Sequence, residues 1–222
     1  MPEEGLFNTV IVANNLNPSI FSQLWLVKNG VFAETEFDQS KPLIFTPMAV
    51  NVATRELELM VLPQMLQATF VQKNVDYERL LKKTLGTIAN LLPHTPYQAV
   101  GFNLIWNLRP KDPVEYKKID RAIFLSKDNP LHKSFGEDNC RFGGYFSKDV
   151  SMGRLRLNIA PVTLPFSKET TPIEGLQLTF NFNHDLTEQN RAGEIFNFLG
   201  YWSSAHKMAQ EMVADVGKGW SE

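Results

Sequence analysis

Several stretches of the chain alternate between hydrophobic and polar residues, which is typical of strands with one face buried and one face in water. In the longest stretch, residues 98–108, every second side chain from Val100 to Leu108 is hydrophobic. Strands of this kind are predicted at residues 48–52, 56–61, 66–70, 98–108, 154–159 and 176–183, and further strands at 10–13 and 143–150. The connections between neighbouring strands are short, which favours antiparallel pairing.

Four helices are predicted where hydrophobic residues recur every three or four positions. Each follows a residue that can cap a helix, and two begin with a proline, which suits the first helical position. The predicted helices span residues 18–28 after Asn17, 76–91 from Asp76, 113–124 after Asp112, and a last helix that starts from a Thr187 cap. Residues 125–141 and 165–174 are polar and irregular, so they are predicted to be loops.

The two halves of the chain show the same order of elements: strand, helix, several strands, helix. Two short sequence matches support this order, residues 15–18 with 107–110 and residues 66–70 with 176–180. Internal similarity of this kind indicates duplication, although capped helices and alternating strands also resemble one another without common origin. We therefore predict an α+β fold in one domain, residues 1–222, with two pseudo-repeats at approximately 6–95 and 96–215.

A strand–helix–strands–helix unit that is doubled within one chain can build a continuous antiparallel sheet with the long helices packed on one face. The TATA-box-binding protein has this general topology. The comparison concerns topology only, because a shared fold does not imply a shared function.

Composition is that of a protein with an ordinary packed core. The 222 residues are 43% hydrophobic and 21% charged, with a formal net charge of −2, and nucleic-acid-binding domains usually carry a basic excess instead. A single cysteine excludes an intramolecular disulfide and suits a reducing compartment. No long apolar run and no signal-like start are present, so we expect a cytoplasmic protein without membrane contact.

A resemblance to a known family comes from the middle of the chain. There His94-Thr95-Pro96 is followed by Gly101 and Asn103, and the segments 17–26 and 183–185 add to the likeness. The pattern resembles a family of uncharacterised bacterial proteins of about this length. The resemblance implies a bacterial or phage origin, and because the family has no assigned activity, it supplies no catalytic residues.

Candidate catalytic groups are few. The four histidines are too far apart in sequence for metal-ligand spacing, and phosphate-binding glycine loops and the Gly-x-Ser-x-Gly elbow are absent. His184 lies beside Asp185, but adjacent residues of a strand point to opposite faces, so these two side chains are not expected to pair. His94 lies at the predicted corner between a helix and a strand, where it is expected to hydrogen-bond the backbone. The sequence therefore predicts no metal, no cofactor and no catalytic residues, with His94 and His184 as the remaining candidates.

A more informative pattern is an uncharged polar face on the predicted sheet. Its residues carry amide or hydroxyl groups with two arginines beside them: Gln67, Thr69, Asn103, Asn107, Arg154, Arg156, Gln177, Thr179, Asn181 and Asn183. A face that is only solvated usually carries Lys and Glu. A solvated sheet face explains these residues, and the alternative is a recognition surface for a peptide, sugar or nucleotide; the sequence leaves both open.

The last predicted helix is apolar over a wide arc, formed by Phe196, Phe198, Tyr201, Trp202 and Met208. A helix of this kind is usually buried from more than one side, so self-association through it is predicted, giving a homodimer.

Taken with the polar face, these features favour a non-enzymatic interaction or assembly protein that binds a protein partner. The first alternative is a small-ligand-binding module or an enzyme, with a pocket under residues 125–141 or at His94. The second is nucleic-acid binding by the sheet through Arg154 and Arg156.

Overall fold

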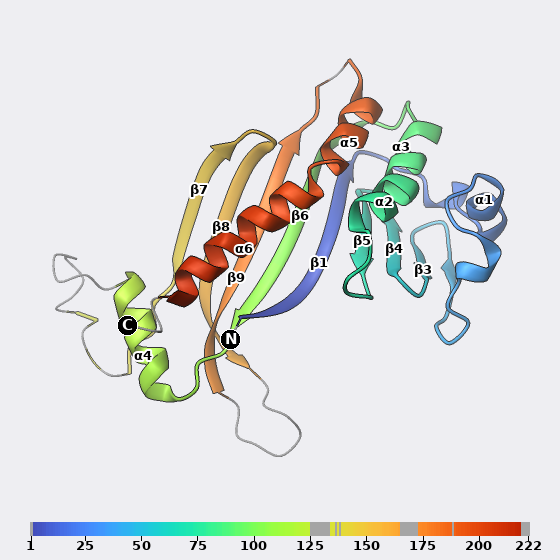
Figure 1. Cartoon of the computed structure of the whole chain (residues 1–222). Coiled ribbons are helices and arrows are strands. Elements are labelled where there is room, and N and C mark those ends of the chain that lie inside the picture. Colours follow the sequence, from blue (N-terminus) through green and yellow to red (C-terminus); the bar gives the residue numbers. More distant parts are fainter. Residues whose placement is uncertain are drawn as a thin grey trace.

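The described part of the chain forms one antiparallel sheet of nine strands, and helices are packed against it (Figure 1). In this computed structural model, the described residues are 2–124, 134, 135, 137, 139–164, 173–187 and 189–218. The strands follow the order β2-β3-β4-β5-β1-β6-β9-β8-β7. The predicted α+β class and the continuous antiparallel sheet are confirmed, because β1 of the first half pairs directly with β6 of the second.

The strands and helices agree closely with the pattern of hydrophobic residues. The strands are β1 Pro2–Ala13, β2 Ile44–Phe45, β3 Val50–Ala53, β4 Leu57–Leu62, β5 Met65–Phe70, β6 Tyr97–Leu108, β7 Gly144–Val150, β8 Gly153–Leu164 and β9 Ile173–Asp185. The helical segments are η1 Pro18–Ile20, α1 Gln23–Lys28, η2 Glu34–Glu36, α2 Tyr77–Leu81, the π-helical η3 Lys82–Gly86, α3 Thr87–Leu91, α4 Pro113–Phe124, α5 Arg191–Leu199 and α6 Trp202–Lys218.

Three predicted boundaries at the ends of helices are wrong. The helix expected over residues 18–28 is split, because Phe21 is extended and the side chain of Ser22 caps a separate α1. Thr187 does not cap the last helix; the side chain of Asn190 accepts a hydrogen bond from the backbone N–H of Gly193 and does so instead. That helix is also interrupted after Leu199, which gives α5 and α6.

Three strands are longer than their local sequence predicts, and one of them is β8, which runs to Leu164 rather than to residue 159. β1 begins at Pro2 rather than at residue 10, since it lies between β5 and β6 and forms ladders on both edges. β9 begins at Ile173, so residues 173 and 174 belong to a strand and not to the predicted loop. The rest of that loop, and most of the loop predicted at 125–141, lie outside the described residues.

Trp202, at the start of α6, occupies the middle of the core. Its ring lies 6.2 Å from that of Phe7 in β1, 5.1 Å from Phe102 in β6 and 5.1 Å from Phe70 in β5. From there α6 runs diagonally across the sheet in front of β6 and β9 (Figure 1). One side of the central strands is therefore packed with aromatic side chains, and the other side carries mostly polar groups.

Among the described residues, no helix combines the length and the apolar character that are needed to cross a membrane.

Candidate functional site: the amide face of the sheet

The ten predicted site residues lie on one face of the central strands. Most of them alternate with buried neighbours on their own strands, and the buried neighbours point toward the side that carries Trp202. We call the polar side the amide face. Gln67 and Thr69 come from β5, Asn103 and Asn107 from β6, Arg154 and Arg156 from β8, and Gln177, Thr179, Asn181 and Asn183 from β9.

The strand register aligns several of these residues into one straight row across the sheet. Arg156 pairs with Asn181, and Asn181 pairs with Asn103. On the other side of β6, Asn103 pairs with Asn8, and Asn8 pairs with Thr69. Directly opposed residues of antiparallel strands bring their side chains within contact distance, so five polar groups from five strands form one row.

Three amides at the centre of this row form a directional chain of hydrogen bonds. The Nδ2 group of Asn181 donates to Oδ1 of Asn103 at 2.8 Å, and Nδ2 of Asn103 donates to Oδ1 of Asn8 at 2.8 Å. Within the described part of the chain, Oδ1 of Asn181 accepts no side-chain hydrogen bond and Nδ2 of Asn8 donates none. The chain therefore has an available acceptor at one end and an available donor at the other.

A second row, next to the first, contains Gly101. Gly101 pairs with Val10 on β1 and with Asn183 on β9. A Cβ atom at Gly101 would lie 2.8 Å from the carbonyl oxygen of Phe182 and 3.6 Å from the amide groups of Asn181 and Asn183. Glycine at this position thus allows β6 to approach the backbone of β9 closely.

The two arginines differ in their surroundings. Arg154 donates to the hydroxyl of Ser147 and forms an ion pair of 2.8 Å with Asp149, both on β7. Arg156 is exposed and has no ion pair or hydrogen bond among the described residues. The amide face therefore has one cation available at its end, rather than a line of cations.

No family model matches this chain, and no curated protein matches it significantly. The geometry of the site therefore carries the functional argument.

Asn8 is a central member of the row that the sequence did not predict. The strand was predicted to begin at residue 10, where the apolar run of residues 10–13 starts, and the polar Thr9 precedes that run. In the structure Thr9 is fully buried among apolar side chains. Phe7 and Ile11, both hydrophobic and two positions from Thr9 on either side, were the signal that could have identified this strand.

His184 lies away from the amide face, on the side of β9 that faces α5. Its Nε2 atom is 3.2 Å from a carboxylate oxygen of Glu194, and its ring stacks on Phe198. The same carboxylate accepts hydrogen bonds from the hydroxyl and backbone N–H of Thr187, and the hydroxyl bond is the main cause that lowers the pKa of Glu194. These contacts of His184 and Glu194 connect β9 to α5. Asp185 takes no part in them, because its carboxylate accepts a hydrogen bond from the side-chain amide of Asn183.

His94 is exposed at the corner between α3 and β6 and makes no hydrogen bond or ion pair among the described residues. The structure thus places the two histidine candidates on different elements and does not bring them together. In the described part of the chain no three His, Cys, Asp or Glu side chains are grouped as metal ligands.

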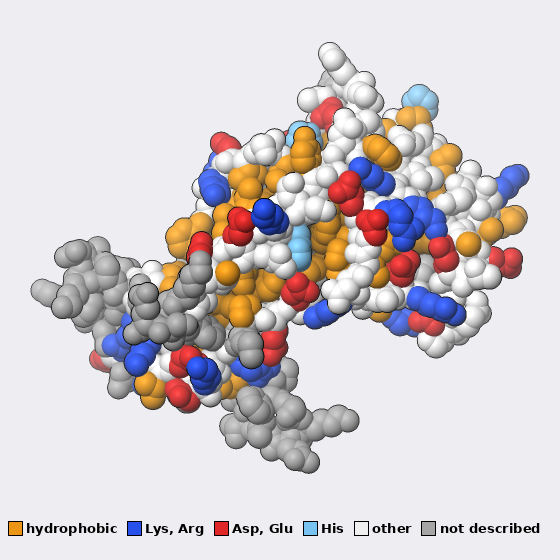
Figure 2. Space-filling model, viewed as in Figure 1, with side chains coloured by type: hydrophobic (Ala, Val, Ile, Leu, Met, Phe, Trp, Pro, Cys, Tyr) orange, Lys and Arg blue, Asp and Glu red, His pale blue; other side chains and the backbone are white. Residues whose placement is uncertain are grey.

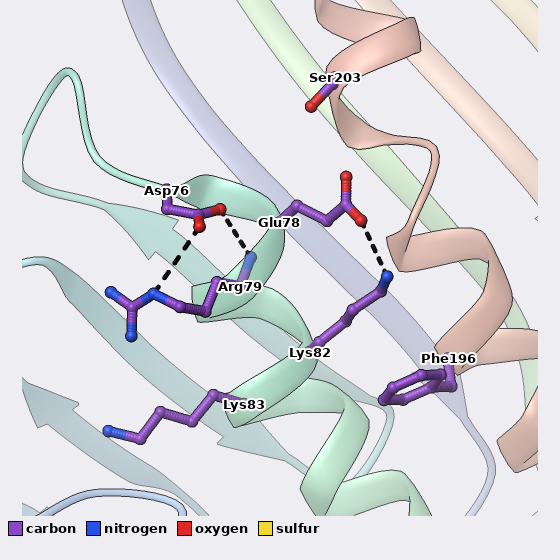
Figure 3. Close-up of a pocket in the computed structure, with 7 residues that line it drawn as sticks. All are labelled: Asp76, Glu78, Arg79, Lys82, Lys83, Phe196 and Ser203. Carbon is purple, nitrogen blue, oxygen red and sulfur yellow. Dashed lines mark hydrogen bonds and ion pairs between the residues drawn. The ribbon is translucent and has the colours of Figure 1, made fainter.

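A charged groove of about 700 Å³ lies on the helical side, between α2 and η3 on one wall and α5 and α6 on the other (Figure 3). Its cations are paired with carboxylates: Arg79 with Asp76, Lys82 with Glu78, and Lys83 with Glu36. Lys82 also lies 5.5 Å from the ring centre of Phe196. Because these pairs neutralise one another, the groove offers no net charge for an anionic ligand.

The apolar arc of the last predicted helix is largely buried within the same chain. Phe198 stacks on Phe102 at 4.5 Å, and Trp202 is 2% exposed. Phe196 and Tyr201 remain exposed, at 39% and 43%. Self-association through this helix stays a prediction, and it would rest on these two exposed rings.

His206 of α6 is half-buried between Phe7 and Trp106 and faces Glu4 at 3.5 Å. Burial is the main cause that lowers the pKa of His206 below 6.5, while the charge of Glu4 raises it. Between the folded-state pKa and 6.5, the unfolded chain binds more protons than the folded chain, so stability rises with pH across this interval. Above pH 6.5, protonation of His206 no longer lowers the free energy of unfolding.

His206→Gln is expected to reduce this dependence of the unfolding free energy on pH, and Glu4→Gln is expected to enlarge it. Urea denaturation at pH values above and below 6.5 measures both effects. An unchanged slope in His206→Gln would show that this imidazole does not titrate with folding.

Proposed function

We propose that this protein is a non-enzymatic interaction protein that binds its partner through the amide face. The observation that carries the proposal is the three-amide chain Asn181–Asn103–Asn8, which crosses the junction of the two halves and keeps a donor and an acceptor available. The mutual hydrogen bonds hold the amides in fixed orientations. A surface that is ordered before binding loses less entropy when a partner docks.

The chemistry of this face favours a protein or peptide partner. A polypeptide presents N–H donors and C=O acceptors together, which is what the two ends of the amide chain require. Apolar side chains such as Val10 and Ile105 lie beside the amides and are only partly buried. Uncharged hydrogen-bonding groups mixed with apolar contacts resemble the composition of ordinary protein interfaces.

The distribution of charge supports a protein partner over nucleic acid. Phosphate neutralisation by several cations supplies most nucleic-acid affinity, whereas Arg156 is the cation of the amide face without a carboxylate partner in the described part of the chain. On the helical side, Lys and Arg side chains lie interspersed with Asp and Glu (Figure 2). Neither arrangement resembles a track for a phosphate backbone.

We infer further that the amide face was created by duplication of one unit. Reading outward from the β1–β6 pair, the strand order is β5-β4-β3 on one side and β9-β8-β7 on the other. Phe7 and Phe102, Asn8 and Asn103, and Pro18 and Pro113 occupy equivalent places, each pair 95 positions apart in sequence. This alignment supersedes the match of residues 15–18 with 107–110, because Asp112 is the residue that caps α4.

Packing of the helices on one side is the second part of this proposal. Phe198 of α5 and Trp202 of α6 contact Phe102, whose side chain lies on the face opposite the amides. In the first half, the Lys83–Glu36 ion pair joins η3 to η2. With the helices on that side, the other side of the sheet stays free for a partner.

The double substitution Asn103→Ala with Asn181→Ala tests the proposal. It removes both hydrogen bonds of the amide chain, and we expect partner affinity to fall about tenfold or more, since a lost hydrogen bond costs about 0.5–1.5 kcal/mol and leaves other groups unpaired. The partner is isolated from native lysate with the unaltered chain, and its affinity is then measured by calorimetry.

Asn197→Ala is the matched control, because Asn197 is an exposed amide on α5, on the helical side. It is expected to leave affinity unchanged. Equal affinity of the double variant and the unaltered chain, with both folded, would remove the amide face as the binding surface.

A further inference from the structure

The outer edge of β7 is a long strand edge that pairs with no other described strand. β7 spans seven residues, and its other edge pairs with β8. Tyr145 is 64% exposed and Phe146 is 49% exposed. The opposite edge of the sheet, β2, has only two residues and lies between Pro42 and Pro47. A short, proline-flanked edge cannot extend a ladder, whereas a long edge with exposed aromatic residues is a template for one.

We propose that two copies of this chain pair through β7, antiparallel to each other, with the two-fold axis at Ser147. The two nine-stranded sheets then become one continuous sheet, and their amide faces lie on the same side of it. This inference does not depend on the identity of the partner or on the proposed function of the amide face.

The backbone of β7 is oriented for this pairing. The hydroxyl of Ser147 donates to the carbonyl oxygen of Leu155 at 3.2 Å, so that carbonyl points toward β7, where Leu155 pairs with Lys148. Hydrogen-bonded and non-hydrogen-bonded positions alternate along an antiparallel pair. Ser147, one position from Lys148, therefore directs its N–H and C=O groups to the outer edge, as do Tyr145 and Asp149.

Pairing these three outward residues around Ser147 uses the whole length of the strand. Ser147 then faces Ser147 of the second copy, and Tyr145 faces Asp149. Both positions place outward N–H and C=O groups against one another, which the antiparallel ladder requires.

The side chains of β7 suit the same register. On the helical side, Phe146 faces Lys148 of the second copy, so each ammonium lies beside an aromatic ring, a favourable cation–π arrangement. On the amide face, the Tyr145 hydroxyl faces the Asp149 carboxylate. No pair in this register brings like charges together, and like charges directly opposite each other destabilise strand pairing.

An apolar groove of about 560 Å³ lies along this edge. Its walls include Phe146, Leu155 and Leu157 of the hairpin and Met212 of α6. In the proposed register the two Phe146 rings are diagonal neighbours across the junction, close enough for aromatic side chains to touch. The second copy therefore covers the exposed ring and one side of the groove.

Sedimentation velocity of the full chain tests the proposal. A species of twice 25.3 kDa is expected to form with increasing concentration. Ser147→Pro removes the outward N–H and no backbone bond to β8, because proline has no N–H and is tolerated on edge strands. It also removes the two hydrogen bonds of the Ser147 hydroxyl with Arg154 and Leu155. We expect the dimer dissociation constant to rise about tenfold or more, which corresponds to about 1.4 kcal/mol.

A charge exchange tests the register independently of proline. Phe146→Lys places two lysines opposite each other at both equivalent positions and is expected to weaken the dimer. Combining Phe146→Lys with Lys148→Glu converts both repulsive pairs into ion pairs and is expected to restore it. If the combined variant does not recover the dimer, the proposed register is overturned.

Tyr201→Lys separates this interface from one through the helices, since Tyr201 is exposed between α5 and α6. It is expected to leave the dimer intact. A chain that stays monomeric at every concentration, or a dimer that Tyr201→Lys abolishes while the β7 variants keep it, would overturn pairing through β7.

Discussion

Replacing Trp202 with alanine is expected to lower the free energy of unfolding by about 3–5 kcal/mol, the usual cost of truncating a buried Phe or Trp. The indole is 2% exposed and contacts aromatic rings from β1, β5 and β6. Its loss leaves a cavity where both halves of the sheet meet α6. Because small domains have only about 5–15 kcal/mol of total stability, a large fraction would be lost.

Tyr201→Ala is the control for this substitution. Tyr201 is the preceding residue, but its side chain is 43% exposed, so a change within about 0.5 kcal/mol is expected. Urea denaturation of both variants measures the difference. Similar losses in the two variants would mean that α6 does not depend on the Trp202 cluster for its attachment to the sheet.

Gly153→Ala is expected to lower the free energy of unfolding by about 3 kcal/mol, from backbone strain together with a steric clash. Gly153 has a φ of +137°, a conformation that other residues rarely adopt. A Cβ atom there would lie 2.2 Å from the carbonyl oxygen of Asn183 on β9, which cannot move without breaking the ladder. The substitution should therefore displace the β7–β8 hairpin.

Gly30→Ala separates the two causes. Gly30 also has a positive φ, of +71°, but a Cβ atom there would have no neighbour within 4 Å. The loss should be about 1 kcal/mol, the usual cost of a left-handed conformation for a residue with a side chain. If Gly153→Ala costs no more than Gly30→Ala, the close approach to Asn183 does not constrain the hairpin.

Much of the fold follows from the local sequence, because a strand with one buried face has a period of two that is visible without coordinates. This is why β4, β5, β6 and the core of β9 were predicted within a few residues. The same period assigned Asn103 and Asn181 to the polar face, because each alternates with hydrophobic residues that face the core. That they are directly opposed could not be predicted, because register depends on pairing between distant segments.

The parts that were missed depend on tertiary contacts. β1 extends to Pro2 because β6 pairs with it there, and nothing in the local sequence of that segment indicates a partner. Asn8 is the exception, because Phe7 and Ile11 in the local sequence could have placed it on a strand. Asn190, rather than Thr187, caps α5 because Glu194 binds the Thr187 hydroxyl, an interaction that requires the helix to be in place already.

The proposed function gives the two sides of the sheet separate roles. The aromatic side packs against α5 and α6, whereas the amide face is the proposed binding surface. Substitutions such as Trp202→Ala should therefore change stability first, and substitutions of Asn103 and Asn181 should change binding first. The β7 edge would align two such faces, so that a partner with two binding segments could bind both.

Photo-crosslinking from two matched positions tests the amide face most directly. A photoreactive amino acid replaces Arg156 on the amide face in one variant and Lys207 on α6 in the other, both exposed basic positions on opposite sides of the sheet. Upon irradiation in the native cell, we expect a defined crosslinked partner from position 156 and none from position 207. Crosslinks from position 207 alone would contradict the proposed binding surface.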